Sequence, residues 1–396
     1  MLDHFTGRAR PLVSKSPGEI FDLTEQVVSA LVYESPPGKV GEELATKGYA
    51  HSHWFAILPS CKVPRLLLPL GNTYRMLEGF QIYMPFAPIA RVMKALAIRA
   101  IEAGWSGRGR RRVLVATEQP LPLERLVTKA SGEREPVFAL SLGTPGACRK
   151  LTLQVMHPDG GILGYIKLPL TEAATERVRH EAATLERLWT FPSLRPYIPN
   201  LLHAGEWSDG YILFQSPGPL GRGPIEFGPL HEEFLQTLRS AHQVEKPGHV
   251  LVQEVAARWR NADPLLGADW RELGERALAR AGGDLEGVMI PCGIMHGDFA
   301  PWNTRVGNGR LFVFDWETAV WGAPILWDTF HFHVQVAQSL VKKRRRDLAR
   351  SRTKEEEASF LLYLLTSLSQ YFIEERAPSD HAGVSYRRRL LVDALD

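Results

Sequence analysis

The sequence predicts an α+β protein in which a small antiparallel sheet precedes a mainly helical region. Two observations support this prediction. Residues 137–168 contain three short β-type runs separated by turns rich in glycine and proline. Beyond residue 219, apolar residues recur at spacings of three and four, as in helices with one buried face. Residues 1–135 have turns and apolar runs of their own, and they predict a further small α/β unit.

Length and composition restrict the class of protein. A chain of 396 residues can bury two or three cores, and 44% hydrophobic with 23% charged residues is typical of globular proteins. The net charge of +3 gives no reason to expect a nucleic-acid partner. The three cysteines form no CxxC pair, so we expect a reducing, cytoplasmic setting. The first residues lack a signal-peptide pattern, and no apolar run is long enough for a membrane span.

The N-terminal part contains two short apolar runs at residues 54–58 and 113–116, which predict buried strands. Turns are expected at residues 36–38 and 71–72. Residues 89–103 predict a helix whose buried face carries a stripe of Ile89, Val92, Met93, Leu96, Ala97, Ala100 and Ile101. The basic run at 108–112 is interpreted as a solvated loop, with an anionic partner as the alternative.

The expected elements of the sheet region follow in order along the chain. The first three strands are predicted at 137–142, 151–156 and 162–168, with a hairpin turn at 157–161. A helix at 172–189 follows, capped by Thr171, and two further strands are expected at 201–206 and 211–214. Helices are then predicted at 231–243, 254–260, 270–281, 325–340 and 355–374. The expected domains are 1–135, 136–218 and 219–396.

The chemistry is predicted by the segment HGDFAPWN at residues 296–303. Phosphoryl transfer needs a carboxylate that faces the attacking hydroxyl and oxygen ligands that hold magnesium on the phosphates. Asp298 and Asn303 have the Asp-x4-Asn spacing of a kinase catalytic loop, so we expect Asp298 to be the catalytic base and Asn303 a metal ligand. The apolar run at 311–314 delivers Asp315 at a strand end, where a second metal ligand is expected.

These residues together resemble the aminoglycoside phosphotransferase and choline kinase family. The resemblance rests on HGDFAPWN, on FDWE at residues 314–317, and on Gly322, Pro324 and Asp328 further along. It covers residues 137 to 396 and implies a bilobal protein-kinase-like fold, with a small sheet lobe, a helical lobe and ATP between them. The gap before Asp328 is about one residue longer than the usual pattern, so Asp328 is expected to be a structural anchor only.

The resemblance also implies a nucleotide site in the small lobe. Lys167 on the third strand is expected to hold the phosphates, paired with Glu181 on the next helix, or with Glu176 as the second choice. The loop from Gly143 to Gly146 lacks the complete glycine-rich pattern, so phosphate cradling and a plain hairpin both remain open. Two residues at the hinge, Gln215 and Ser216, are expected to read the adenine edge through backbone groups.

Three histidines near the motif have expectations of their own. His296 is expected to hold the loop rather than to transfer protons. His331 and His333 are two residues apart, so on a helix their rings point to different sides, and no further ligand follows at metal-site spacing. We therefore interpret this pair as core or surface histidines.

The predicted function is ATP- and Mg²⁺-dependent phosphoryl transfer to a hydroxyl of a small molecule, such as a sugar, an aminocyclitol or aminoglycoside, or an amino alcohol. Two alternatives remain: a protein or peptide kinase, and a catalytically silent kinase-like scaffold in a biosynthetic complex. The segment DWE in place of DFG argues against a protein kinase. Residues 1–135 could recognise the acceptor, bind a biosynthetic protein partner or brace the small lobe.

Overall fold

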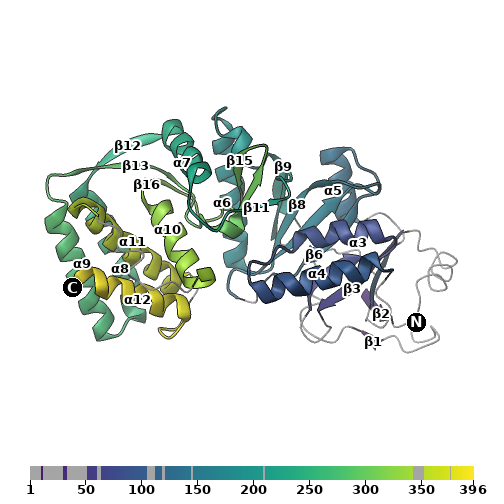
Figure 1. The fold of residues 1–396 in the computed structure, drawn as a ribbon, viewed down its shortest axis with the longest axis horizontal. Helices are drawn as coiled ribbons and strands as arrows, with labels where there is room; N and C mark the ends of the chain where they lie inside the picture. Colours follow the sequence, from purple (N-terminus) through teal and green to yellow (C-terminus); the bar gives the residue numbers. More distant parts are fainter. Residues whose placement is uncertain are drawn as a thin grey trace. The chain divides into compact units, whose positions relative to one another are not determined.

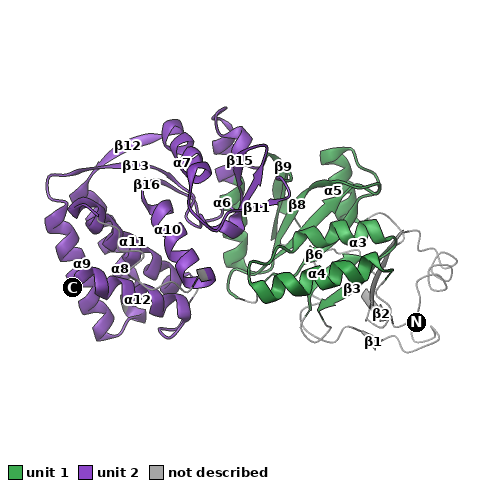
Figure 2. Cartoon of the chain, in the orientation of Figure 1, with its two compact units in different colours: residues 1–182, 200–217 green, residues 183–199, 218–396 purple. Residues whose placement is uncertain are grey.

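The computed structural model divides the chain into two compact units (Figures 1 and 2). Unit 1 comprises Met1–Ala182 and Asn200–Pro217, and unit 2 comprises Ala183–Pro199 and Gly218–Asp396. The structure describes residues 10–11, 30–33, 51–59, 64–104, 112–117, 121–143, 146–207, 210–341, 352–374 and 376–396. The expected turn at 36–38 and the basic run up to residue 111 lie outside these residues.

Unit 1 is built on one ten-stranded antiparallel sheet, with the strand order β1-β2-β5-β3-β4-β6-β7-β8-β10-β9. Its strands are β1 (Arg10–Pro11), β2 (Ala30–Tyr33), β3 (His51–Pro59), β4 (Pro64–Pro69), β5 (Arg112–Thr117), β6 (Val137–Ser141), β7 (Lys150–Met156), β8 (Ile162–Pro169), β9 (Leu201–Trp207) and β10 (Gly210–Gln215). The predicted strands are confirmed within β3 and β5–β10. Because β4 pairs with β6 at Leu66 and Ser141, the N-terminal strands extend the same sheet. A separate role for residues 1–135 stays a prediction.

Alternating side chains explain why these segments form strands. Leu151, Leu153 and Val155 of β7 point to one face of the sheet and join one hydrophobic core. Ile166 of β8 and Phe214 of β10 belong to the same core. Burying a continuous apolar face is the largest favourable contribution to the stability of such a sheet.

The helices of unit 1 include one whose predicted buried face is wrong. They are α3 (Thr73–Gly79), the short η2 (Phe80–Ile82), α4 (Pro88–Glu102), α5 (Pro122–Ser131) and α6 (Glu172–Trp189), the last of which ends in unit 2. The α4 helix exists, but Ile89, Val92, Met93 and Leu96 are 59–80% exposed, whereas Ile101 is 1% exposed. Only the C-terminal half of α4 reaches a core, through Ala97, Ile98 and Ile101. Periodicity identifies an apolar stripe, but it does not show which part of the stripe another element covers.

The α6 helix confirms the other predicted stripe. Ala174, Val178, Ala182, Leu185 and Leu188 are all at most 2% exposed. Thr171 accepts a hydrogen bond from the backbone N–H of Ala174 at 3.1 Å, which is the expected cap at the helix start.

Unit 2 combines short sheets with a helical core. The sheets have the orders β11-β14-β15 and β12-β13-β16. Their strands are β11 (Gly221–Arg222), β12 (Gln243–Pro247), β13 (Met289–Met295), β14 (Thr304–Gly307), β15 (Arg310–Val313) and β16 (Val320–Pro324). The helical elements are η3 (Arg195–Tyr197), α7 (Pro229–Ala241), α8 (Gly248–Ala262), η4 (Asp263–Leu265), α9 (Ala268–Asp284), η5 (Pro301–Asn303), α10 (Trp327–Val336), the π-helix η6 (Ala337–Val341), α11 (Lys354–Ile373) and α12 (Ala382–Leu395).

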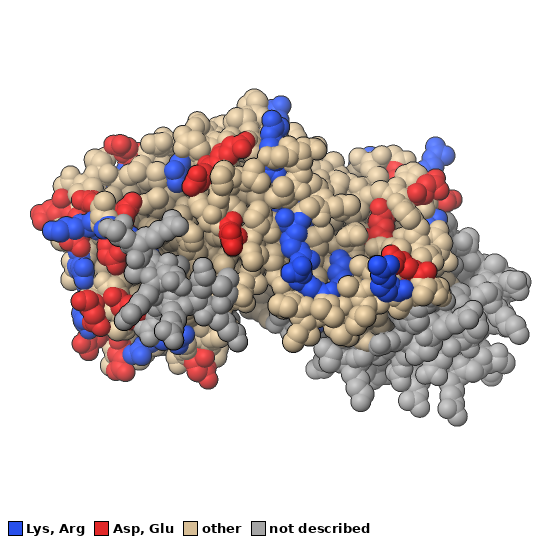
Figure 3. All heavy atoms as spheres, in the orientation of Figure 1, with Lys and Arg blue, Asp and Glu red and all other residues tan. Residues whose placement is uncertain are grey.

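The core of unit 2 lies between α8, α9, α11 and α12 and includes Trp259, Leu362 and Leu391. The five predicted helices of this region are confirmed as α7 to α11, whereas α12 and most of the short strands were not predicted. In the face of unit 2 drawn in Figure 3, acidic and basic side chains are intermixed, in keeping with the small net charge. Among the described helices, none combines the length and the apolar character that crossing a membrane requires.

Candidate active site

The predicted catalytic loop follows β13 in unit 2 and ends in the single turn η5. Gly297 adopts a φ of +86°, and a Cβ there would lie 2.2 Å from the carbonyl oxygen of Thr318. Only glycine fits this backbone conformation without strain and without a backbone clash. The tight approach to Thr318 therefore explains why a glycine stands between His296 and Asp298.

Asp298 is held by three hydrogen bonds from two side chains. The Asn303 amide nitrogen donates to Asp298 Oδ2 at 2.7 Å and to the Asp298 carbonyl oxygen at 2.9 Å. On the other side, His331 Nε2 lies 3.0 Å from Asp298 Oδ1. The Asp298 side chain is 36% exposed, so the anchored carboxylate still reaches the surface of unit 2. This geometry suits a group that must receive a proton from an approaching hydroxyl.

His296 has the structural role that we expected. Its Nδ1 accepts from the backbone N–H of Asp298 at 3.2 Å, and its Nε2 bonds to the carbonyl oxygen of Phe314 at 3.0 Å. These two contacts require the neutral imidazole with the proton on Nε2. Complete burial lowers the pKa of His296, which favours the same neutral form.

Asp328 anchors the start of the loop, as expected. Its two carboxylate oxygens accept from the backbone N–H groups of His296, at 2.7 Å, and Gly297, at 3.1 Å. Burial raises the pKa of this carboxyl group, while the two N–H groups and the neighbouring His296 oppose the shift. A buried carboxyl group bound to two successive backbone N–H groups fixes the direction of the loop relative to α10.

Asp315 follows β15 and adopts a φ of +71°, which is uncommon for a residue other than glycine. The preceding residue, Phe314, donates its N–H to the carbonyl oxygen of Asn303 at 3.1 Å. The next residue, Trp316, is fully buried, and its indole N–H bonds to the Val313 carbonyl at 3.0 Å. These contacts hold the backbone at Asp315 next to the backbone at Asn303, and they keep Asp315 in a strained conformation. Such strain is common at functional sites.

The donor atoms in unit 2 fit a magnesium ion. The Asn303 side chain makes its two hydrogen bonds to described residues through its nitrogen, so the amide oxygen is the atom that would bind a cation. Asp315 supplies a half-buried carboxylate. Magnesium prefers such oxygen ligands and usually retains waters and phosphate oxygens as its other ligands.

Unit 1 brings together the predicted lysine and glutamate. Lys167 Nζ lies 2.5 Å from both carboxylate oxygens of Glu181, and the two residues are 4% and 0% exposed. The second choice, Glu176, is exposed on another side of α6. Removing either member of a buried ion pair leaves an uncompensated charge, so this pair fixes the lysine ammonium firmly.

The other predicted nucleotide contacts have clear structural roles. Gly143 has a φ of +63°, and its Cβ would lie 2.3 Å from the Lys150 carbonyl oxygen, whereas a Cβ at Gly146 meets nothing within 4 Å. The close approach to Lys150 therefore accounts for a glycine at position 143, and phosphate cradling by this loop stays a prediction. At the hinge, the N–H of Ser216 is donated to the Asn200 carbonyl at 2.8 Å, and Gln215 lies in β10 with 3% exposure. Because the N–H of Ser216 is already donated to Asn200, Ser216 would have to recognise adenine through its carbonyl oxygen.

Sequence reasoning missed the contact between His331 and Asp298. The histidine pair was weighed as a metal site and interpreted as core or surface histidines, although His331 lies three residues after the anchor Asp328 on α10. Residues three apart share one face of a helix, so an anchor at 328 directs residue 331 toward the same loop. The three-residue spacing of Asp328 and His331 was therefore the sequence pattern that could have predicted this contact.

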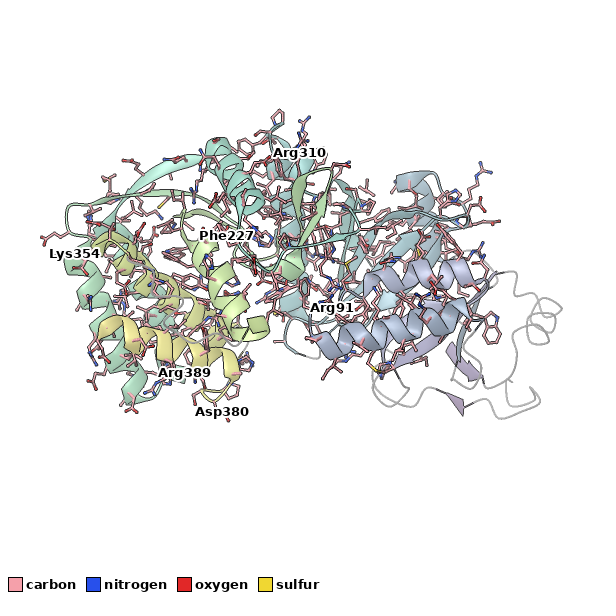
Figure 4. All side chains as sticks on the ribbon, in the orientation of Figure 1. Arg91, Phe227, Arg310, Lys354, Asp380 and Arg389 are labelled. Atoms are coloured by element: carbon pink, nitrogen blue, oxygen red, sulfur yellow. The ribbon has the colours of Figure 1, made fainter. Side chains whose placement is uncertain are left out.

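A cavity of about 650 Å³ lies on the opposite side of α10. Its walls include Thr329 and His333 of α10, Glu232 and Glu233 of α7, and Phe227, which Figure 4 labels. Thr329 and His333 are each two residues from His331 and therefore point about 200° away from it around the helix. This cavity does not open toward Asp298.

The antiparallel sheet, the helical unit and the anchored carboxylate loop are features of kinase-like phosphotransferases. The model of the phosphotransferase enzyme family matches residues 149–358, which is more than half of the chain. The protein belongs to this family. The predicted resemblance is confirmed, although the match ends before most of α11 and all of α12.

Solved structures of aminoglycoside phosphotransferases are among those to which the chain is similar, at low sequence identity. An apo thermostable mutant of APH(4)-Ia is 14% identical, with 69% of this chain and 98% of that chain covered and a TM-score of 0.47. Wild-type aminoglycoside 2'-phosphotransferase-IIIa in complex with GDP is 14% identical, with coverages of 69% and 97% and a TM-score of 0.42. The GDP and kanamycin complex of APH(2")-IIIa is 13% identical, with the same coverages and a TM-score of 0.43. No curated protein sequence matches the chain.

Proposed function

We propose that this protein transfers the γ-phosphoryl group of ATP to a hydroxyl of a small molecule, such as a sugar, an aminocyclitol or an amino alcohol. The observation that supports this proposal best is the carboxylate of Asp298, which Asn303 and His331 hold while part of it stays exposed. The acceptor oxygen would form a bond to the γ-phosphorus, the bond to the ADP oxygen would break, and Asp298 would accept the hydroxyl proton.

In this proposal each remaining residue has one task. Asn303 Oδ1 and Asp315 would hold Mg²⁺, which neutralises charge on the phosphates when it is bound. Lys167, fixed by Glu181, would contact the nucleotide phosphates. A cytoplasmic setting also remains part of the proposal, and it rests on the cysteine pattern of the sequence.

The test is ADP release measured with ATP or GTP, Mg²⁺ and a panel of sugars, aminoglycosides and amino alcohols. We expect release that depends on one class of acceptor, and we expect Asp298→Ala to reduce it by about 10³-fold or more, since the base and the hydroxyl orientation are both lost. A matched control is Asp380→Ala, because Asp380 is an exposed aspartate before α12 (Figure 4).

Wild-type turnover by Asp298→Ala would contradict the assignment of the base. If no acceptor in the panel supports ADP release while ATP still binds, the result would favour the silent scaffold. Transfer to serine or threonine peptides but not to small molecules would favour the protein kinase.

A further inference from the structure

A chain of buried polar side chains runs from Asp298 into the C-terminal helices of unit 2. His331 of α10 is 7% exposed, and its Nε2 lies 3.0 Å from Asp298 Oδ1. On its other side, His331 Nδ1 lies 3.2 Å from the hydroxyl oxygen of Tyr363 on α11. The two rings are nearly perpendicular, at 86°, so the tyrosine hydroxyl meets the edge of the imidazole.

The contacts define which atoms carry the protons. Asp298 Oδ1 can only accept, so a neutral His331 imidazole carries its proton on Nε2, and Nδ1 then accepts from the Tyr363 hydroxyl. Tyr363 is 1% exposed, and burial raises its pKa to about 12, in keeping with a protonated hydroxyl. The Gln335 amide nitrogen lies 3.2 Å from the same His331 Nε2, and the flipped amide would present its oxygen to that proton.

We propose that His331, oriented by Tyr363, is a positioning residue for Asp298. His331 donates to Oδ1 while Asn303 donates to Oδ2, so both oxygens of the carboxylate are fixed. A carboxylate held at both oxygens can neither rotate nor fold away from the acceptor, and such restraint of orientation contributes directly to rate. This inference rests on the proposed function of Asp298.

The C-terminal helices hold Tyr363 in turn. Arg387 of α12 is fully buried and donates to Ser367 of α11 at 2.7 Å and to Gln338 at 2.8 Å. Tyr363 lies on α11 four residues before Ser367, and the Arg387 guanidinium opposes the rise in the pKa of Tyr363. Tyr363 and Arg387 lie beyond residue 358, where the match to the family model ends.

The first test is spectroscopic and needs no acceptor. Protein with ¹⁵N-labelled histidine gives two-bond ¹H–¹⁵N correlations that distinguish the two neutral tautomers, and His331→Gln identifies the His331 signals by their loss. We expect the Nε2–H tautomer, with a Nε2 shift that changes in Asp298→Ala. A Nδ1–H tautomer, or a Nε2 signal that Asp298→Ala leaves in place, would overturn the inference whatever the protein catalyses.

The second test is kinetic. We expect His331→Leu to lower kcat about 30-fold and Tyr363→Phe about 5-fold, with little change in the KM for ATP, because orientation and not binding is lost. His331→Gln should recover part of the loss, since its amide nitrogen can take the place of Nε2 as donor. The matched control is His333→Leu, because His333 lies on the opposite side of α10.

Thermal melting of each variant separates misfolding from mispositioning. Wild-type kcat in folded His331→Leu, or equal losses in the glutamine and leucine variants, would show that His331 only fills space. Failure of the proposed function looks different, because the wild-type protein itself would then release no ADP with any acceptor.

Discussion

At the scale of single residues, the environment of a side chain decides its chemistry more than its type does. His296, His331 and His231 are all buried in unit 2, yet each has a different set of partners. His296 bonds to backbone groups on both nitrogens, whereas His331 lies between a carboxylate and a phenol. The first therefore supports the loop, and we propose that the second positions the Asp298 carboxylate.

His231 is a buried histidine among aromatic rings, with Phe332 at 4.7 Å and Phe227 at 5.1 Å between ring centroids. Burial lowers its pKa to about 4 from the ordinary 6.5. Between these values the unfolded chain binds a proton that the folded protein does not, so stability falls as the pH decreases through this range. The buried His296 adds to the effect in the same direction.

We therefore expect His231→Phe to flatten the acid limb of the stability curve. The free energy of unfolding lost between pH 7 and pH 5 should be smaller by about 2 kcal/mol than in the wild type. Urea unfolding at a series of pH values measures this. His249→Phe, which removes an exposed histidine of α8, is the control, and an unchanged slope in His231→Phe would contradict the prediction.

At the scale of elements, the exposed stripe of α4 is the clearest departure from the sequence prediction. The first two turns carry large apolar side chains at helical spacing, yet they do not pack on the described residues of unit 1. Basic residues flank the stripe, including Arg91, which Figure 4 labels. Nothing in the described structure shows what covers this face.

Two alanine substitutions in α4 test the exposure directly. We expect Leu96→Ala to cost less than about 0.5 kcal/mol of unfolding free energy, because a 59% exposed side chain loses little burial. Ile101→Ala should cost about 2–4 kcal/mol, because it opens a cavity in a packed core. Urea unfolding measures both, and equal losses would mean that the stripe is covered in solution.

The catalytic loop shows how an element can be fixed by contacts from outside itself. Asp328 and His331, both on α10, hold the two ends of the segment from His296 to Asp298. A helix is a rigid platform, so attaching a loop to two of its side chains restricts the loop more than internal hydrogen bonds alone would.

At the scale of the whole molecule, the nucleotide contacts predicted for Lys167 belong to unit 1, whereas the predicted magnesium ligands belong to unit 2. Binding of a ligand to the folded protein alone raises the free energy of unfolding, by about 2.7 kcal/mol at a hundred times the dissociation constant. Thermal stability measured with variants of either unit therefore tests each set of predicted contacts separately.

We expect a non-hydrolysable ATP analogue with Mg²⁺ to raise the melting temperature by several degrees. The rise should shrink when Mg²⁺ is chelated, and it should nearly vanish in Lys167→Ala. Glu176→Gln, which changes an exposed glutamate on the same helix as Glu181, is the control. A full rise in Lys167→Ala would show that Lys167 does not contact the nucleotide.

Features that depend on short distances along the chain could be predicted from the sequence alone. Alternation over a few residues predicted β6, β7 and β8, and the five-residue spacing of Asp298 and Asn303 identified the loop in which a hydrogen bond joins these two side chains. Local periodicity specifies the backbone geometry of a segment and which of its side chains lie on one face. Both properties follow from the same few backbone dihedral angles.

The contacts between distant elements depend on tertiary packing and could not be predicted from the sequence. His331 is 33 residues from Asp298 and 32 from Tyr363, and no periodicity links those positions. The exposure of the α4 stripe likewise depends on whether another element packs against it. Which elements pack together depends on the shape and burial of the complete fold. The contacts from Tyr363 to His331 and from His331 to Asp298 therefore form only when α10 and α11 are packed in place.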